Sequence, residues 1–224
     1  MRRIALDIET TGLDPHQGHK IIEIGCVELE NNFPTGKVWQ RYVNPNRSMP
    51  QEAYEIHGLT EDFLSEKPFF AEVVGEFIAF INNAELIIHN ASFDLKFINC
   101  ELELLSKNTL SSYEVIDTLK MARKLFPGMP SSLDALCKRY KIDISKRIKH
   151  GALLDAELLA EVYLEMQGGR QQGIELVSEK KEITQLKEQE NNLNYSKKIY
   201  SLNSEELKKH EILRNKITEY KSLK

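Results

Sequence analysis

The sequence predicts an α/β fold, a mixed five-stranded sheet flanked by helices, and three observations carry that prediction. The first 43 residues hold three strand-like segments joined by short turns, a pattern typical of antiparallel strands. Short apolar runs then alternate with segments of helical period, which favours a sheet with helices on both faces. Beyond Gly169 polar residues dominate, and too few apolar ones remain to build a core. We therefore expect one domain over residues 1–169 and a flexible polar tail over 170–224, largely disordered when free, that docks partners.

The composition is that of an ordinary soluble protein. Of the 224 residues 41% are apolar, enough to bury one core, and no apolar run approaches the roughly 18 to 20 residues of a membrane span. Cys26, Cys100 and Cys137 are too few and too far apart for a disulfide framework or a zinc site. We expect a cytoplasmic protein with no membrane contact. Because the net charge is −4, a nucleic-acid partner would require metal ions or a local basic rim.

Individual elements follow from apolar periodicity and from turn and capping residues. Strands are expected within residues 4–12, at 21–29 and 38–43, and at the short apolar runs 86–88 and 115–117, with a turn over 31–36. Helices are expected at 51–56, after Thr60 as N-cap, at 69–81, from 91 to about 105 with Asn90 as cap, and at 118–125, 132–140 and 153–166. A polar, basic loop over 141–149 precedes the last of these helices.

The first strand carries two acids in an apolar setting. Asp7 and Glu9 flank Ile8, and side chains alternate along a strand, so both carboxylates point away from the face that Leu6 and Ile8 share. If that apolar face packs into a core, two like charges lie side by side at its margin. Such a pair requires a cation, either Lys or Arg or a divalent metal.

Two further acids and a histidine occupy comparable positions. Asp94 lies in the first turn of a helix that follows an apolar strand, where open α/β sheets bind ligands. Asp155 lies near the start of the last long helix, and His150 precedes it on the entering loop beside Gly151. Each residue alone is most often a surface group, since acids are common near helix starts. Together they make a more specific hypothesis.

Four carboxylates from three segments can hold two divalent cations, which clamp the attacking and leaving oxygens of a phosphodiester. Oxygen ligands favour Mg²⁺ or Mn²⁺ over zinc. A histidine, with a pKa near neutrality, can take the proton from the attacking water. No Lys or Arg lies within the first strand, so the pattern favours metal ions as the compensating charge.

These residues, in this order, resemble the motifs of the DEDDh 3′–5′ exonucleases. The segments Leu6–Gly12, His19–Gly25, Ile88–Asp94, Ser132–Cys137 and Ser145–Ala156 all fit, over residues 1 to about 169, and are most similar to the proofreading members that serve bacterial replicative DNA polymerases. The resemblance implies an RNase H-like fold and removal of mispaired 3′-terminal nucleotides from single-stranded or frayed DNA.

The resemblance also implies roles for individual residues. Metal ligation falls to Asp7, Glu9, Asp94 and Asp155, with Asp7 and Glu9 also near the substrate, and the general base is His150. Glu52 and His57 are expected to hold the terminal nucleotide, Thr10, Thr11 and Gly12 to bring backbone N–H groups to it, and Phe93 to border its base. Lys146, Arg147 and Lys149 are expected to meet the phosphate backbone.

The tail suggests two partners. Gln171, Ile174 and Leu176 form a Gln-x-x-aliphatic-x-Leu pattern, similar to short peptides that dock on the bacterial sliding clamp. Farther on, Asn203 or Ser204 can cap an amphipathic helix that would need a partner groove for stability, and the resemblance implies the polymerase catalytic subunit as that partner.

Two rival functions stay open at this point. One is a DEDDh ribonuclease that trims RNA 3′ ends, which differs in substrate and not in the residues that act. The other is a non-catalytic adaptor subunit whose acids only hold structural ions.

Overall fold

The computed structural model describes residues 1–145, 147, 149–168, 204–205, 207–212 and 214. Contacts divide the chain into one unit over Met1–Ile174 and a second over Glu175–Lys224, and every strand and helix labelled below belongs to the first. Among the described residues no helix is both long and apolar enough to cross a membrane.

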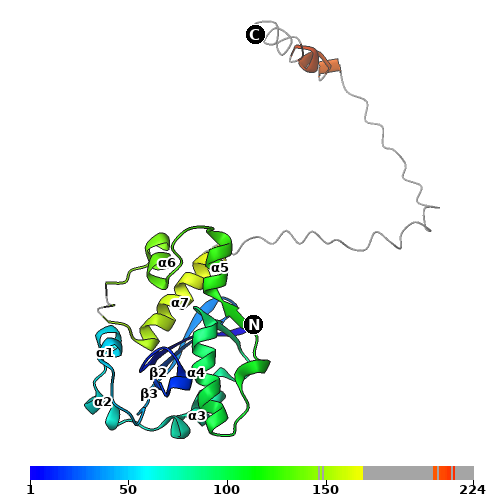
Figure 1. Cartoon of the computed structure of the whole chain (residues 1–224). Helices are drawn as coiled ribbons and strands as arrows, with labels where there is room; N and C mark the ends of the chain where they lie inside the picture. The colour runs from blue at the N-terminus through cyan, green and yellow to red at the C-terminus, as the bar shows by residue number, and fades with distance from the viewer. Residues whose placement is uncertain (146, 148, 169–203, 206, 213, 215–224) are drawn as a thin grey trace, which may run out of the picture. The chain divides into compact units, whose positions relative to one another are not determined.

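The first unit is built on one five-stranded mixed sheet with the strand order β3-β2-β1-β4-β5 (Figure 1). β1 pairs with β2 and β2 with β3 in antiparallel fashion, whereas β4 lies parallel to both β1 and β5. The predicted mixed sheet is thereby confirmed. The strands are β1 (Arg2–Thr10), β2 (Ile21–Glu30), β3 (Phe33–Tyr42), β4 (Glu85–Ile88) and β5 (Val115–Asp117).

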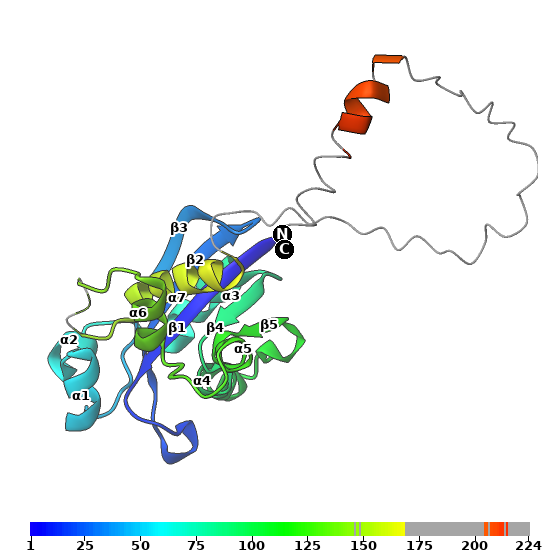
Figure 2. The same ribbon diagram turned by 90° about the horizontal axis from the view of Figure 1, so that it is seen from above.

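Helices cover both faces of the sheet. α3 and α4 pack on one face, and α5, α6 and α7 pack on the other, each side around its own cluster of buried apolar residues. Figure 2 shows α7 lying across β1 and β2. The helices are α1 (Gln51–His57), α2 (Glu61–Ser65), α3 (Phe70–Ile81), α4 (Ala91–Leu104), α5 (Thr118–Leu125), α6 (Leu133–Tyr140) and α7 (Ala152–Met166), with 3₁₀ turns η1 (Pro15–Gln17) and η2 (Leu110–Ser112).

The side chains of β1 divide between these two faces as the alternation predicts. Ile4, Leu6 and Ile8 pack into the core beneath α3 and α4, whereas Ala5 packs beneath α7. Asp7 and Glu9 share the parity of Ala5 and therefore face the α7 side. The sheet face that carries the acids is thus the face on which α7 begins.

The hairpin between β2 and β3 is tighter than the sequence predicts. The turn consists of Asn31 and Asn32 alone, whose φ angles of 51° and 65° are those of a two-residue turn with both residues left-handed. Phe33 therefore already pairs with Glu30, and β3 begins inside the stretch expected to be a loop. Asparagine tolerates positive φ, so the pair itself forms the whole connection.

Asn90 does not cap α4 in the expected way. Its backbone is left-handed, with φ 66°, and its side chain makes no capping hydrogen bond. Asp94, in the first turn, instead accepts backbone N–H bonds from itself and from Ile8. The start of α4 is thereby joined to the end of β1. Thr60 and Ser132 do cap their helices, accepting bonds from the backbone N–H groups of Phe63 and Ala135.

In the second unit, residues 204–205, 207–212 and 214 are helical, in line with the helix expected there. Its proposed cap Asn203 lies outside the described residues, as do Gln171, Ile174 and Leu176 of the expected clamp-binding pattern.

Candidate active site

Four acidic side chains from three separate segments share one electrostatic environment. Asp7 and Glu9 come from β1, Asp94 from the first turn of α4 and Asp155 from the first turn of α7. Burial, and then the charges of Asp94, Glu9 and Asp155, hold the pKa of Asp7 well above its usual range. Burial likewise raises the pKa of Asp94. These shifts reflect negative charges gathered close together and withdrawn from water.

The pKa of Glu9 shows the effect of burial and of the neighbouring charges. Its side chain is 9% exposed. Burial and the neighbouring charge of Asp155 raise its pKa to about 8, against the opposing influence of His150. Glu9, His150 and Asp155 each offer a ligand atom, and these atoms all lie within 4.8 Å of one another. The three groups are therefore close enough to share one cation.

Asp155 differs from its neighbours because it is already paired. Burial disfavours its charged form, but hydrogen bonds from His150 and Arg147 outweigh burial and lower its pKa. Its Oδ2 lies 3.1 Å from Nδ1 of His150, and this contact raises the pKa of the imidazole. The His150 side chain is 46% exposed, so it lies at the open side of the site.

Arg147 enters the site in a position that the sequence did not predict. Its Nε donates to Asp155 Oδ1 at 2.5 Å and its Nη2 to Oδ2 at 2.7 Å, a bidentate pair, while Nη1 contacts Asp134. The guanidinium was expected to meet phosphate; in this structure it neutralises Asp155. The cation that compensates Asp155 thus comes from the loop before α7.

His150 Nδ1 has two competing partners. Arg147 Nη2 lies 2.8 Å from it, and Asp155 Oδ2 lies 3.1 Å from it. When Nδ1 accepts from Arg147, the proton of the neutral ring is on Nε2, and the ring has no free lone pair. When Nδ1–H donates to Asp155 instead, Nε2 is free to accept a proton. Only the second arrangement allows His150 to act as a base.

The loop that carries His150 rests on α1. The His150 backbone N–H donates to Ile56 O at 3.2 Å, and Lys149 Nζ contacts Glu55 O. These contacts place the loop beside His57, the last residue of α1. Sequence positions almost a hundred residues apart therefore meet at the rim of the site.

His57 is a buried, neutral donor. Leu59 N–H donates to its Nδ1 at 3.0 Å, so the ring proton is on Nε2. Burial, and then the charge of Lys149, lower its pKa to about 4. Within the described part of the chain Nε2 is buried and has no hydrogen-bond partner. A buried donor without a partner is costly and suits a site that a ligand completes.

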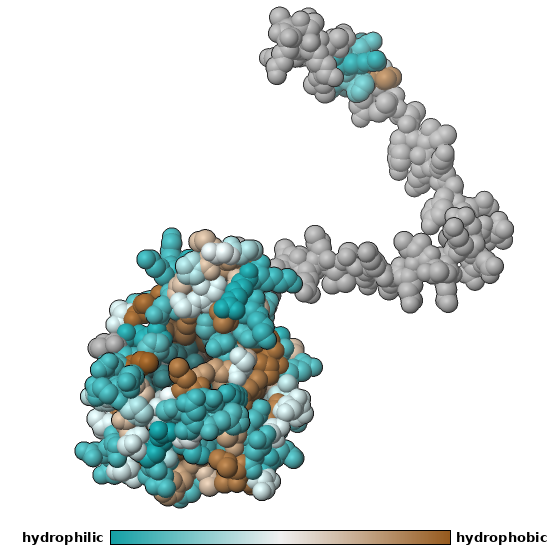
Figure 3. Space-filling model, viewed as in Figure 1, coloured by the Kyte–Doolittle hydropathy of each residue, from teal (hydrophilic) through white to brown (hydrophobic). Residues whose placement is uncertain are grey.

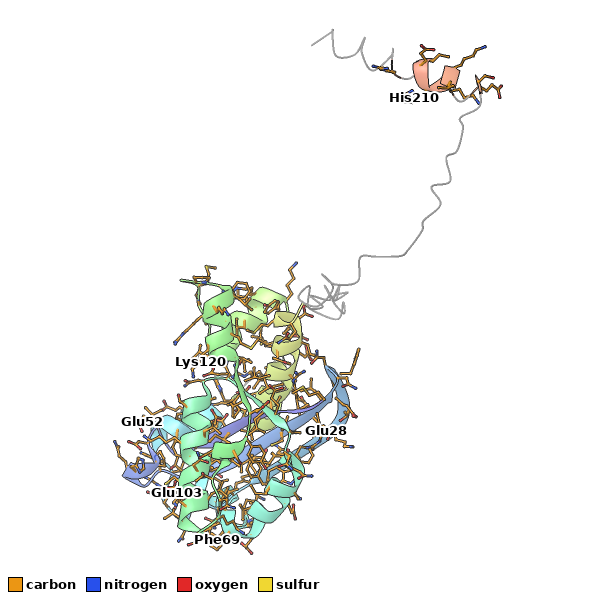
Figure 4. The ribbon with its side chains drawn as sticks, turned by 90° about the vertical axis from the view of Figure 1, so that its right-hand side faces the viewer. Glu28, Glu52, Phe69, Glu103, Lys120 and His210 are labelled. Carbon is orange, nitrogen blue, oxygen red and sulfur yellow. The ribbon has the colours of Figure 1, made fainter. Side chains whose placement is uncertain are left out.

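The remaining predicted site residues lie near the end of β1 or on neighbouring helices. The Thr10 hydroxyl donates to Gly12 O at 2.7 Å. The His19 ring packs on Gly12, where an added Cβ would meet it at 2.3 Å. Phe93 is partly buried against Phe97, with ring centroids 5.1 Å apart. Glu52 is exposed on α1 (Figure 4). Their roles stay predictions.

Glu23 is a third acid on the α7 face of the sheet, besides Asp7 and Glu9, and the sequence did not single it out. It is 2% exposed and lies opposite Glu9 in the β1–β2 register. Burial raises its pKa, against hydrogen bonds from Gln40 and from the backbone of Ala152 and Leu153. The sequence did contain an indication of this residue, because an acid inside the apolar segment Ile21–Leu29 is as unusual as Asp7 and Glu9 are in the first strand.

The donor set fits a divalent metal centre. Its groups are carboxylates and one imidazole, and oxygen ligands are those that Mg²⁺ and Mn²⁺ prefer. Burial, and then neighbouring negative charge, raise the pKa values of three of the four carboxyl groups, and a bound cation would favour their ionised forms. Figure 3 shows hydrophobic residues gathered in patches among hydrophilic ones on one face of the unit.

Comparison with known proteins agrees with the fold. A family model described as exonuclease matches residues 4–163, and the chain belongs to this family. DEDDh exonucleases generally use divalent metal ions.

Similar curated proteins include epsilon subunits of bacterial DNA polymerase III. DNA polymerase III subunit epsilon of Rickettsia conorii is 49% identical over 215 residues, covering 94% of each chain. The subunit of that name from Escherichia coli K12 is 52% identical over 176 residues, covering 75% of this chain and 72% of that one. The resemblance drawn from the motifs is confirmed.

Solved structures give the same fold. Exonuclease X in complex with 5′ overhanging duplex DNA has a TM-score of 0.58 and 29% identity, covering 75% of this chain and 90% of that one. The nuclease domain of 3′hExo, a DEDDh family member bound to rAMP, has a TM-score of 0.64 at 21% identity. The match covers 75% of this chain and 92% of that one. The latter likeness supports the RNase H-like fold alone.

Proposed function

We propose that this chain is the proofreading 3′–5′ exonuclease subunit of a bacterial replicative DNA polymerase, and that it removes mispaired 3′-terminal nucleotides by hydrolysis. The observation that carries the proposal is the meeting of Glu9, His150 and Asp155 at one point, with Asp7 and Asp94 coupled to them by charge. The names of the similar curated proteins, subunits of a bacterial DNA polymerase, supply the biological setting, and the cytoplasm is the compartment proposed for this chain.

Asp7, Glu9, Asp94 and Asp155 would hold two Mg²⁺ or Mn²⁺ ions. When bound, such a pair stabilises charge on the attacking and leaving oxygens of a phosphodiester. The protein's part is to supply ionised carboxylates. Because Glu9 has a pKa of about 8, it would have to lose a proton before it could ligate, and a bound metal would favour that loss near neutral pH.

His150 acts as the general base through Nε2. Asp155 Oδ2 accepts the Nδ1–H bond, orients the ring and stabilises its protonated form, which agrees with the raised pKa of the imidazole. The contact between Arg147 and Nδ1 has to break for this to occur. Arg147 would meet the phosphate, the role that the sequence suggested, once it has also released the two Asp155 oxygens that it holds here.

His57 and its neighbours hold the terminal nucleotide. His57 Nε2–H is a neutral, buried donor without a protein partner among the described residues, and a nucleotide oxygen would satisfy it. Glu52 lies on the same helix, Phe93 offers an aromatic surface for the base, and Thr10 and Gly12 lie at the end of β1.

The partners are DNA, the polymerase catalytic subunit and the sliding clamp. Exonuclease X, which has a similar fold, was solved with DNA. The polymerase contact is proposed for the C-terminal tail, and the clamp contact for Gln171, Ile174 and Leu176. The former rests on the family relation and the latter on the sequence pattern.

A primer with a mismatched 3′ end tests the function. With Mg²⁺ or Mn²⁺ the purified chain should remove the terminal nucleotide, and Asp7→Ala should abolish this activity while the protein stays folded. An RNA strand of the same sequence should be cut more slowly; faster cutting would indicate the RNA-trimming alternative. Normal folding and partner binding without any turnover would indicate the adaptor.

His150→Gln tests the base. A general base contributes about 10²- to 10⁴-fold to rate. The variant should lose activity on that scale, whereas Mn²⁺ affinity measured by calorimetry changes far less. Equal losses in rate and affinity would make His150 a metal ligand.

A further inference from the structure

Glu23 is a buried carboxylate for which the proposed chemistry has no use. It lies on β2 directly opposite Glu9, on the sheet face that α7 covers, and only 2% of it is exposed. Like charges directly opposite each other in an antiparallel pair are destabilising. A purely structural sheet position would not favour glutamate there. Some local donor must compensate Glu23.

That donor is the first turn of α7. The Glu23 carboxylate accepts hydrogen bonds from the backbone N–H groups of Ala152 and Leu153, and from Gln40 Nε2 at 2.7 Å. The residue at the N-cap position of α7 is Gly151, which has no side chain to fill this role and makes no capping bond. Glu23 therefore caps α7 from a neighbouring strand.

Gly25, two residues along β2, explains how the helix comes so close. A Cβ built at Gly25 would lie 2.3 Å from the backbone carbonyl carbon and oxygen of Ala152 and from the nitrogen of Leu153. The start of α7 thus rests directly on β2, opposite Asp7 in the register. Asp155 lies in this same turn, and its own N–H donates to Gly151 O at 2.9 Å.

We propose that Glu23 is a positioning residue for the metal site: by capping α7 it fixes Asp155 against Asp7 and Glu9. It contacts neither substrate nor metal. The inference rests on the proposed function in one respect, since it takes Asp155 to be a metal ligand. Its effect is on metal affinity, because a shifted α7 would move one carboxylate away from the other three.

Glu23→Gln removes the charge and retains one acceptor oxygen. Residues that orient metal ligands typically change metal affinity by about 10- to 100-fold when replaced, so the variant should bind Mn²⁺ more weakly on that scale in a calorimetric titration. The Mn²⁺ concentration for half-maximal hydrolysis should rise in parallel. The rate at saturating Mn²⁺ should largely recover, because Glu23 takes no part in the chemical step.

Glu28→Gln is the matched control. Glu28 lies on the same strand, is 3% exposed and is paired with Arg2 and Lys37. It lies on the opposite side of the unit from Glu52 of α1 (Figure 4). This control should lower thermal stability and leave Mn²⁺ binding unchanged. If Glu23→Gln and Glu28→Gln shift Mn²⁺ affinity equally, Glu23 is only structural and the proposal is wrong.

Gln40→Leu keeps the test decisive if Glu23→Gln does not fold. Gln40 lies on the edge strand β3 and orients the Glu23 carboxylate. Its loss should weaken Mn²⁺ binding in the same direction by a smaller factor, and unchanged binding would overturn the proposal. A wild-type chain that binds no Mn²⁺ would instead refute the proposed function.

Discussion

At the scale of single residues, the acids of the site differ in whether a cation already compensates them. Asp155 has Arg147 and His150, and its pKa is lowered. Asp7, Glu9 and Asp94 have raised pKa values because burial and mutual repulsion outweigh the cations nearby. Without metal, the site therefore holds protons on some of its carboxyl groups at neutral pH.

This protonation predicts an unusual pH dependence of stability. The pKa of Glu9 is about 8 in the folded chain, against 4.5 for an ordinary glutamate, so the folded form binds more protons than the unfolded form between these values. Stability of the metal-free protein should therefore fall as pH rises from about 5 to 8. Thermal unfolding in a chelator tests this, and Glu9→Gln should flatten the profile. With saturating Mn²⁺ the trend should weaken or reverse, since the metal binds the ionised form.

Arg147 predicts a competition with metal for Asp155. The side chains of the pair are 7% and 4% exposed, and removing one partner of a buried pair costs about 3 kcal/mol. Arg147→Gln should lower the melting temperature of the metal-free protein and enlarge the increase that Mn²⁺ produces. Arg41→Gln is the control, because its pair with Glu76 is exposed and contributes little. A smaller Mn²⁺ effect in Arg147→Gln would show that Arg147 assists metal binding.

At the scale of elements, the contact of α7 with β2 depends on the absence of a side chain at Gly25. An alanine there would place Cβ 2.3 Å from helix backbone, which cannot rotate away as a side chain can. Gly25→Ala should cost about 1–3 kcal/mol of unfolding free energy, as overpacking does, and should weaken Mn²⁺ binding. Unfolding in denaturant and metal titration measure the two effects.

Gly75→Ala provides the matched control for that variant. It lies within α3, where a Cβ meets nothing within 4 Å and no positive φ is involved. Alanine favours helix over glycine by about 1 kcal/mol, so this variant should be neutral or more stable. If Gly25→Ala is also neutral, α7 can shift to accommodate the added Cβ, and its close contact with β2 does not contribute to stability.

The elements themselves were largely predictable, since each follows from local periodicity and caps. α3, α5 and α7 agree with their predicted bounds to within a residue, because amphipathic spacing and a turn or cap mark both ends. β3 was misplaced because two left-handed asparagines form a shorter turn than Pro34 and Gly36 suggested. Asn90 was misjudged because the same residue type can cap a helix or adopt a left-handed backbone.

At the scale of the whole molecule, the candidate site was predictable where strand order brings its segments together. β1 lies beside β4 in parallel, so the end of β1 and the start of α4 meet and carry Asp7 and Asp94 to one edge. The pairing of Arg147 with Asp155 and the position of Glu23 were not predicted, because both depend on how α7 and its loop pack. Local sequence does not encode that long-range packing.

The division of the chain into two units predicts that catalysis resides in the first unit and polymerase binding in the second. Every residue proposed for metal, base or nucleotide lies within Met1–Ile174. A chain ending at Ile174 should therefore keep Mn²⁺-dependent hydrolysis of a free oligonucleotide and lose binding to the polymerase subunit, measured by gel filtration of the mixture. In the full chain, Gln171→Ala with Leu176→Ala should reduce clamp binding and leave the polymerase complex intact. Retained polymerase binding by the shortened chain would place that contact on the exonuclease unit, and loss of its hydrolysis would make residues 175–224 part of the catalytic fold.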